Sequence, residues 1–216
     1  LFNDNIGLKQ KHIEYKLTKI HIVNSIFIIY IIYIYHLYHF LIFFKSKMYF
    51  KDYPEFTPNI TPQKMFELGI MGGTYFRKIK SLKTKKIYKN NHKKFSFLKK
   101  ISDDKLIQQE YDKNINYYNV EVGTTYEFWM SKNWIKEEYD PYGWIEWYCN
   151  FYNGRRTNDD IRQINRWKKS SGPKGRFRNQ LQRKVNEIGK NKNTIYPRLR
   201  QTLLHWAYDS RKMKVK

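Results

Sequence analysis

The stretch Asp140–Gly175, DPYGWIEWYCNFYNGRRTNDDIRQINRWKKSSGPKG, decides the fold, because aromatic residues and arginines are closely interleaved along it. It holds three of the six tryptophans and four of the eleven arginines of the chain. Tryptophan and tyrosine supply large apolar surfaces to a core, whereas arginine stays at the surface or binds an anion. We therefore expect this stretch to connect the centre of a hydrophobic core to a basic surface.

Two helices are expected within this stretch. Asp140–Pro141 is typical of a helix start, and Gly154 is typical of a helix end. Thr157 and Asp160 predict the start of the second helix. Because they share helical faces with isoleucine and leucine, four tryptophans are expected to be core residues rather than platforms for bases. They are Trp144, Trp147, Trp167 and Trp206.

Cap residues, prolines and periodic apolar residues mark further helices along the chain. Over Lys174–Ile188 the apolar residues are spaced by four, four and three, so they line one side of a helix. Thr124 and Glu127 have the spacing of a capping box. The signal for strands is weak, which predicts a mostly α fold, a small multi-helix basic domain preceded by a single hydrophobic helix. The other expected helices lie over Thr61–Gly69 and Ser102–Tyr111, after Thr124 and from Pro197.

The N-terminal part divides into a basic tail over residues 1–19 and an uncharged segment over residues 20–44. The apolar run over 26–44, IFIIYIIYIYHLYHFLIFF, has about the length that a helix needs to cross a bilayer. We expect residues 20–44 to be a candidate transmembrane helix, which would make this a single-pass membrane protein. Lysines flank the segment equally on both sides, so the positive-inside rule leaves its orientation open.

A second interpretation of the N-terminal part is that it is translated AT-rich non-coding sequence, which also yields runs of isoleucine, tyrosine and phenylalanine. Met48 is the first methionine of the chain. A protein that starts there would be soluble and intracellular, in the cytoplasm or the nucleus. In both interpretations we expect an aromatic-rich helical domain over 48–216. Within it, residues 78–100 are expected to be a lysine-rich, solvated loop, because they include few apolar anchors.

The net charge of +23 is the strongest deviation of the composition from that of an average protein. It predicts attraction to phosphate polymers or to anionic lipid. AT-rich codon usage is an alternative explanation for many of the lysines, but it does not explain the arginines. Ten of the eleven arginines lie at or beyond Arg155, so the C-terminal third carries the informative charge.

The loop before the helix at Lys174–Ile188 is the best candidate for a phosphate site. Its sequence Gly-Pro-Lys-Gly precedes a helix N-terminus, where free backbone amides can bind an anion. The alternative interpretation is a plain turn followed by solvated arginines. Seven basic residues in and near this loop are expected to contact phosphate. They are Arg155, Arg156, Arg162, Arg166, Lys174, Arg176 and Arg178.

No arrangement of catalytic or metal-binding residues is evident in the sequence. Cys149 is the single cysteine, and its aromatic neighbours predict that it is buried. His205 and the pair Asp159–Asp160 are best explained as structural, the two aspartates as charges at a helix start. The sequence Gly72–Thr74 matches no nucleotide-binding loop. We expect no cofactor and no metal, and the sequence leaves open whether the protein is an enzyme.

Four segments between Met48 and about Asp209 carry a resemblance to known sequences. They are FTPNITPQKMFELGIMGGTYFR (56–77), DPYGWIEWYCNFYNGRR (140–156), GPKGRFRNQL (172–181) and PRLRQTLLHWAYD (197–209). These segments resemble a family of uncharacterised proteins from phages, large DNA viruses and scattered eukaryotes. No activity is established for that family, so the resemblance implies no catalytic residues, but it favours Met48 as the start of the domain.

Three functional hypotheses follow from these patterns. The first is a basic all-α domain that binds nucleic acid through phosphate contacts with little readout of sequence. The alternative is a membrane-anchored interaction module that binds anionic lipid or an acidic protein partner. An enzyme that processes nucleic acid comes third, because only the loop before Arg176 and the nearby carboxylates suggest it.

Overall fold

The computed structural model describes residues 27–35 and 48–215, and the chain divides into two compact units, Leu1–Lys47 and Met48–Lys216. In the first unit, residues 27–35 are helical and their side chains are exposed. The basic tail over 1–19 and most of the hydrophobic helix expected over 20–44 lie outside the described residues. Of the helices that are described, none combines the length and the apolar character that a bilayer crossing requires.

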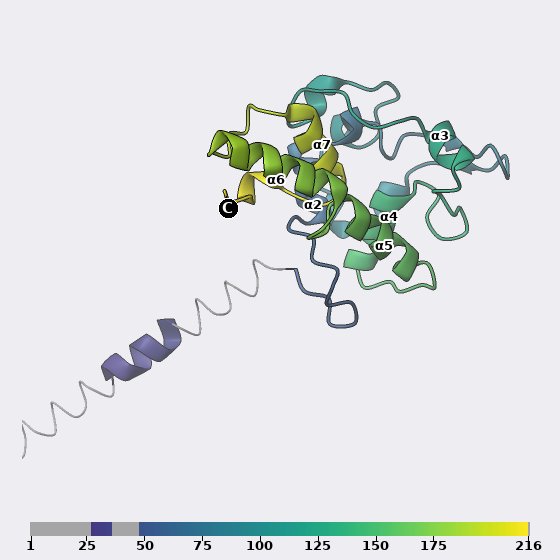
Figure 1. The fold of residues 1–216 in the computed structure, drawn as a ribbon. Helices are drawn as coiled ribbons and strands as arrows, with labels where there is room; N and C mark the ends of the chain where they lie inside the picture. Colours follow the sequence, from purple (N-terminus) through teal and green to yellow (C-terminus); the bar gives the residue numbers. More distant parts are fainter. Residues whose placement is uncertain (1–26, 36–47, 216) are drawn as a thin grey trace, which may run out of the picture. The chain divides into compact units, whose positions relative to one another are not determined.

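The second unit is mostly helical, which confirms the predicted fold class (Figure 1). The α-helices are α2 (Pro62–Leu68), α3 (Tyr126–Ser131), α4 (Trp144–Tyr152), α5 (Asp160–Ser170), α6 (Arg176–Ile188) and α7 (Pro197–His205). Short 3-10 helices occupy Met71–Gly73, Asn91–Lys94, Ser96–Leu98, Asp103–Lys105, Lys113–Ile115 and Ser210–Lys212. The sheet within 48–215 is a single antiparallel pair of strands, β1 (Ile79–Lys80) and β2 (Ile87–Tyr88).

Helix α4 lies at the centre of the main core, where it packs against α2 and α5. Eight of its nine residues are buried, Cys149 among them as the sequence predicts. The ring of Trp147 contacts the rings of Phe56 and Phe151, with centroid distances of 5.5 and 4.9 Å. Its Nε1 donates a hydrogen bond of 2.8 Å to Oδ1 of Asp160, the first residue of α5. Rings from distant parts of the chain therefore meet at the middle of α4.

A smaller apolar cluster forms where α6 packs against α7. Leu181 and Val185 of α6 are fully buried there, which confirms the apolar face predicted for this helix. Ile188 at the end of that face is 38% exposed, so the helix extends beyond the cluster that it covers. Among the described residues, those of both apolar clusters lie at or beyond Met48, so Met48–Lys216 contains a hydrophobic core.

The turn at Gly72–Gly73 is structural. Both glycines have positive φ angles, +54° and +79°. A Cβ atom added at Gly73 would lie 2.0 Å from the carbonyl oxygen of Asp104. The backbone amide of Gly72 donates to Oδ1 of Asn116 at 2.9 Å, so the protein itself occupies this donor.

The lysine-rich segment 78–100 differs from the solvated loop that the sequence predicts. It forms the β1–β2 hairpin and two 3-10 turns, and the side chains of Ile79, Phe95 and Leu98 are buried in the main core. All ten of its lysines are exposed, so a few apolar residues anchor a strand pair and two turns to the core. Exposed lysines dominate the composition of the segment, so the composition alone does not reveal that these apolar side chains are buried.

Three expected helix boundaries also differ. Helix α3 is capped by Thr125 rather than Thr124, because Oγ1 of Thr125 accepts from the third amide of the helix at 3.2 Å. Helix α4 begins at Trp144, after Gly143, and not at Asp140. The expected helix over 102–111 is reduced to one 3-10 turn.

The displaced start of α4 has a physical reason. The carboxylate of Asp140 is buried, and it accepts a hydrogen bond of 2.7 Å from Nδ2 of Asn150 near the end of α4. Asp140 therefore binds the body of the helix instead of capping its first turn. Gly143 takes the cap position with a φ angle of +84°, which favours glycine over residues with a side chain.

Candidate functional site

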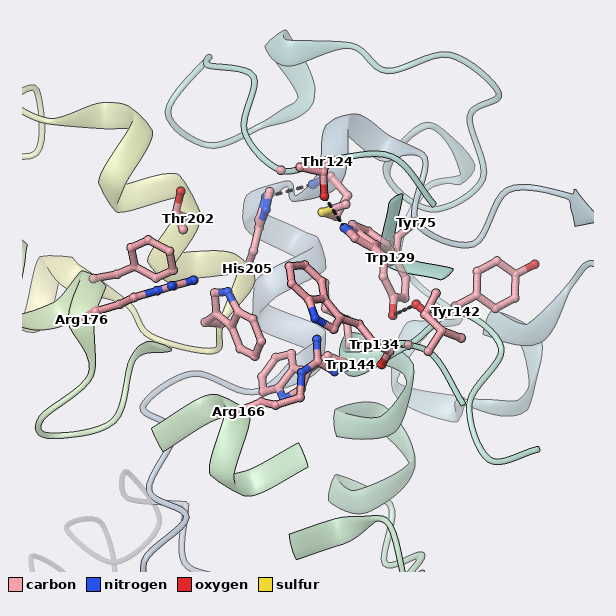
Figure 2. A pocket seen from close by; sticks show the side chains of 17 residues that line it. Tyr75, Thr124, Trp129, Trp134, Tyr142, Trp144, Arg166, Arg176, Thr202 and His205 are labelled. Atoms are coloured by element: carbon pink, nitrogen blue, oxygen red, sulfur yellow. Dashed lines mark hydrogen bonds between the residues drawn. The ribbon is translucent and has the colours of Figure 1, made fainter. Parts of the chain in front are cut away.

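A pocket of about 320 Å³ is lined by residues of all five helices from α3 to α7, and we call it the tryptophan pocket (Figure 2). Trp129, Trp134 and Trp144 lie near its centre in Figure 2, with Arg166 below them and Arg176 at the left. None of the described residues that line it is an aspartate or a glutamate. Four of the six tryptophans of the chain line the pocket: Trp129, Trp134, Trp144 and Trp206.

The tryptophan rings are held in place by hydrogen bonds and by one another. Nε1 of Trp129 donates to Oγ1 of Thr124 at 2.6 Å. The rings of Trp144 and Trp206 are 4.8 Å apart between centroids. Trp134 follows α3 in the connection to α4, and it remains 40% exposed. The pocket thus combines fixed aromatic walls with one more accessible ring.

Arg166 projects from α5 to the wall of the pocket and has no carboxylate partner among the described residues. Its Nη1 donates to the carbonyl oxygen of Trp134 at 3.1 Å and to Oε1 of Gln163 at 2.9 Å. Its guanidinium lies 5.7 and 5.6 Å from the ring centroids of Trp134 and Trp206. Burial lowers the pKa of Arg166 to about 10, and the charge of Arg162 is the second largest cause of this shift. The guanidinium of Arg166 therefore remains cationic at neutral pH. The charge of Asp159 also acts on Arg166, but no described carboxylate lies within ion-pair distance of it. A half-buried cation without such an ion pair favours binding of an anion.

Three basic residues lie at the start of α6: Lys174, Arg176 and Arg178. None of the three forms an ion pair within the part of the chain that the structure describes. No side chain among the described residues caps the first turn of α6, so its amides donate to no side-chain partner there, and the expected binding of an anion to them stays a prediction. Arg176 is exposed and lines the tryptophan pocket, whereas Arg178 lies 4.6 Å from the ring centroid of Tyr208.

The other three arginines expected to contact phosphate are held by carboxylates. The carboxylate is buried in two of these pairs and exposed in the third, that of Asp52. In each pair the carboxylate neutralises part of the positive charge, so these arginines attract a phosphate less strongly than the arginines without an ion pair among the described residues. The pairs are Arg155–Asp140, Arg156–Asp52 and Arg162–Asp159. Of the seven expected residues, the structure brings only Arg166 and Arg176 to the tryptophan pocket.

The acidic residues of α4 and α5 are used inside the fold. The carboxylate of Glu146 is fully buried and accepts from the backbone amide of Tyr142 at 2.9 Å and from Nζ of Lys94 at 2.8 Å. Asp160 accepts from the backbone amide of Thr157 at 2.9 Å, which agrees with its expected role at the helix start. Within residues 27–35 and 48–215, no three His, Cys, Asp or Glu side chains lie close enough together to hold a metal ion.

His205 on α7 is a buried hydrogen-bond acceptor beside the pocket. Its Nε2 accepts from the backbone amide of Met71 at 3.1 Å and lies 3.1 Å from Nε2 of Gln201. Burial lowers the pKa of the imidazole to about 3, so the ring is neutral at physiological pH. Because both neighbours are donors that meet Nε2, the proton of the ring lies on Nδ1. This agrees with the structural role that the sequence suggests.

A second pocket of about 310 Å³ adjoins the tryptophan pocket and has a more polar lining. Arg77 is one of its lining residues, and the buried hydroxyl of Tyr126 has no hydrogen-bond partner among the described residues. The two pockets share the lining residues Met71, Gly123, Thr124 and Trp129.

Sequence reasoning missed the tryptophan pocket. Trp147 and Trp167 are fully buried, as expected for core residues. Trp144 and Trp206 share stripes with apolar residues too, yet they also line the pocket. Helical spacing cannot separate these two cases, because it tells which residues face inward but not whether the space in front of them is filled.

No protein-family model, curated protein or solved structure matches the chain. The resemblance of the four segments to proteins of phages, large DNA viruses and eukaryotes therefore stays a prediction.

Proposed function

We propose that Met48–Lys216 binds nucleic acid through the basic residues at and beside the tryptophan pocket. The observation that carries the proposal is that Arg166 and Arg176 line an aromatic pocket without a carboxylate partner among the described residues. Guanidinium groups bind phosphate oxygens through paired N–H donors, and indole rings stack on bases. A polymer of phosphates and bases matches both features. An acidic protein would supply carboxylates but few flat rings.

The start of α6 supplies further support. Arg176 belongs both to the pocket and to the first turn of the helix, so a backbone that passes the pocket would meet Lys174 and Arg178 as well. The uncapped amides of that turn add donors that carry no sequence preference. Contacts with the phosphate backbone give affinity and fix the position of the protein on the strand. They do not distinguish one base from another.

The triple variant Lys174→Ala/Arg176→Ala/Arg178→Ala is expected to bind oligonucleotides more weakly and with less dependence on salt. Each lost phosphate contact reduces the slope of log affinity against log salt concentration by about 0.7 for single strands, so three contacts reduce it by about 2. The slope is measured by fluorescence anisotropy with a labelled 20-mer over a series of NaCl concentrations.

The matched control is Lys80→Ala/Lys83→Ala/Lys89→Ala, which removes the same charge from exposed lysines of the segment 78–100. We expect its slope to stay within about 0.7 of the wild-type value. If both triple variants changed the slope equally, the affinity would follow net charge alone, and the assignment to α6 would be wrong.

Membrane attachment is a second candidate function, favoured by the uncharged helix over residues 27–35, whose side chains are exposed. If residues 20–44 form an anchor, the full chain should float with neutral phosphatidylcholine vesicles in a density gradient. Met48–Lys216 should remain at the bottom, since neutral vesicles offer no net charge to a basic surface. Recovery of the full chain at the bottom would contradict the anchor.

A further inference from the structure

The lining and the volume of the tryptophan pocket indicate a flat ligand. Four indole rings contribute to its walls, and aromatic faces bind other flat rings by offset or edge-to-face stacking. Its volume of about 320 Å³ lies at the lower end of the range for ligand-binding pockets. The space suits one ring system with its substituents and excludes a base pair within a helix.

The polar groups of the pocket are mainly hydrogen-bond donors. Nε and Nη2 of Arg166 donate to no described residue, and the guanidinium of Arg176 forms no ion pair there. His205 carries its proton on Nδ1, because its Nε2 already accepts from the amide of Met71. With no carboxylate in the lining, a ligand rich in acceptors and negative charge is favoured. Aromatic pockets can also bind cationic ligands, but the two guanidinium groups in this pocket would repel a cation.

From these observations we infer that the tryptophan pocket receives one unstacked base of a single-stranded nucleic acid. This inference rests on the proposed function and assigns its substrate class. A base offers a flat ring with carbonyl and ring-nitrogen acceptors, and its own phosphate places negative charge within reach of Arg176. In a duplex the faces of the bases are covered by their neighbours, so insertion there would first require unstacking and unpairing.

The test compares a single-stranded 12-mer of thymidine with an abasic 12-mer of the same length and charge. The wild-type full chain and Met48–Lys216 are titrated with both at 0.15 M NaCl, and tryptophan fluorescence and anisotropy are recorded together. We expect the abasic strand to bind roughly 5- to 100-fold more weakly, as the loss of one stacked base implies. We also expect only the strand with bases to quench the fluorescence. Trp147 and Trp167 are fully buried outside the pocket, so quenching would report on the pocket tryptophans.

The variant Trp134→Ala tests the same inference from the side of the protein. Trp134 is 40% exposed, and its replacement is expected to leave the melting temperature within a few degrees of the wild-type value. It should weaken binding of the thymidine strand by roughly 5- to 100-fold and reduce the difference in affinity between the thymidine and the abasic strand. Tyr49→Ala, which removes an exposed ring that does not line the pocket, is the matched control and should change neither.

The outcomes separate the inference from the function on which it rests. Equal binding of both strands without quenching would overturn the base pocket and leave nucleic-acid binding intact. Absence of binding to either strand would overturn both. If a duplex 12-mer bound as tightly as the single-stranded 12-mer, binding would not require an unstacked base, and the inference would be wrong. If thymidine monophosphate bound as tightly as the 12-mer, the ligand of the pocket would be a free nucleotide. The assignment to single-stranded nucleic acid would then be wrong.

Discussion

Replacing Trp147 by alanine is expected to lower the free energy of unfolding by about 3–5 kcal/mol, the range for a large aromatic residue lost from a core. Trp147 is fully buried, and its ring contacts those of Phe56 and Phe151. The substitution would leave a cavity among the rings that pack against Trp147, which relax only partially around it. It would also remove the hydrogen bond that ties α4 to Asp160 of α5. For a domain of this size the loss corresponds to a decrease in melting temperature of about 6–20 °C.

Urea denaturation followed by far-ultraviolet circular dichroism would measure this loss, with Trp134→Ala as the control. Trp134 is 40% exposed, and its ring contacts are with Phe128 and the guanidinium of Arg166. We expect its replacement to cost about 1 kcal/mol or less. Equal losses for the two variants would mean that α4 is not the centre of the core.

The parts of the fold that depend on local signals could be predicted from the sequence. Pro62 and Pro197 each occupy the first turn of a helix, because a proline there loses no hydrogen bond that the helix would make. The apolar spacing over 174–188 predicts α6, and its burial pattern agrees, since Leu181 and Val185 are fully buried. These predictions need only the residues within one helix.

The parts that depend on distant residues could not be predicted. Arg156 is paired with Asp52, which lies 104 positions away in the sequence. No local pattern distinguishes this arginine from Arg176, which forms no ion pair within the described part of the chain. Some arginines of the expected basic surface are therefore neutralised by carboxylates, and others form no ion pair within the described residues. Phe95 likewise lies among lysines in the sequence but contributes to the core.

The tryptophan pocket could not be predicted for a related reason. Its lining comes from five helices and from the segments between them, and the pocket exists because their side chains leave a space unfilled. The sequence predicts the basic character of the site through Arg166 and Arg176. It does not predict that both lie at one aromatic pocket, which is the feature on which the functional proposal depends.

Acidification is expected to destabilise the protein well above the pH at which carboxylates titrate. Burial lowers the pKa of His205 to about 3 in the folded state, against 6.5 for an exposed histidine. Below pH 6.5 the unfolded chain therefore binds a proton that the folded protein does not, and the free energy of unfolding falls as the pH falls. Between pH 7 and pH 4.5 this difference corresponds to a loss of about 2–3 kcal/mol.

The variant His205→Gln separates this effect from other titrations. The side-chain oxygen of glutamine can accept the hydrogen bond from the amide of Met71, which Nε2 of His205 accepts in the wild type, and glutamine does not titrate. Urea denaturation at pH 7.0, 6.0, 5.0 and 4.5 should show a slope for the wild type that is mostly absent in the variant. Burial also lowers the pKa of His92, which adds a contribution of the same sign that His92→Asn would remove. If His205→Gln kept the full wild-type slope, His205 would be accessible to protons in the folded state. The acceptor role of its Nε2 toward the amide of Met71 would then be wrong.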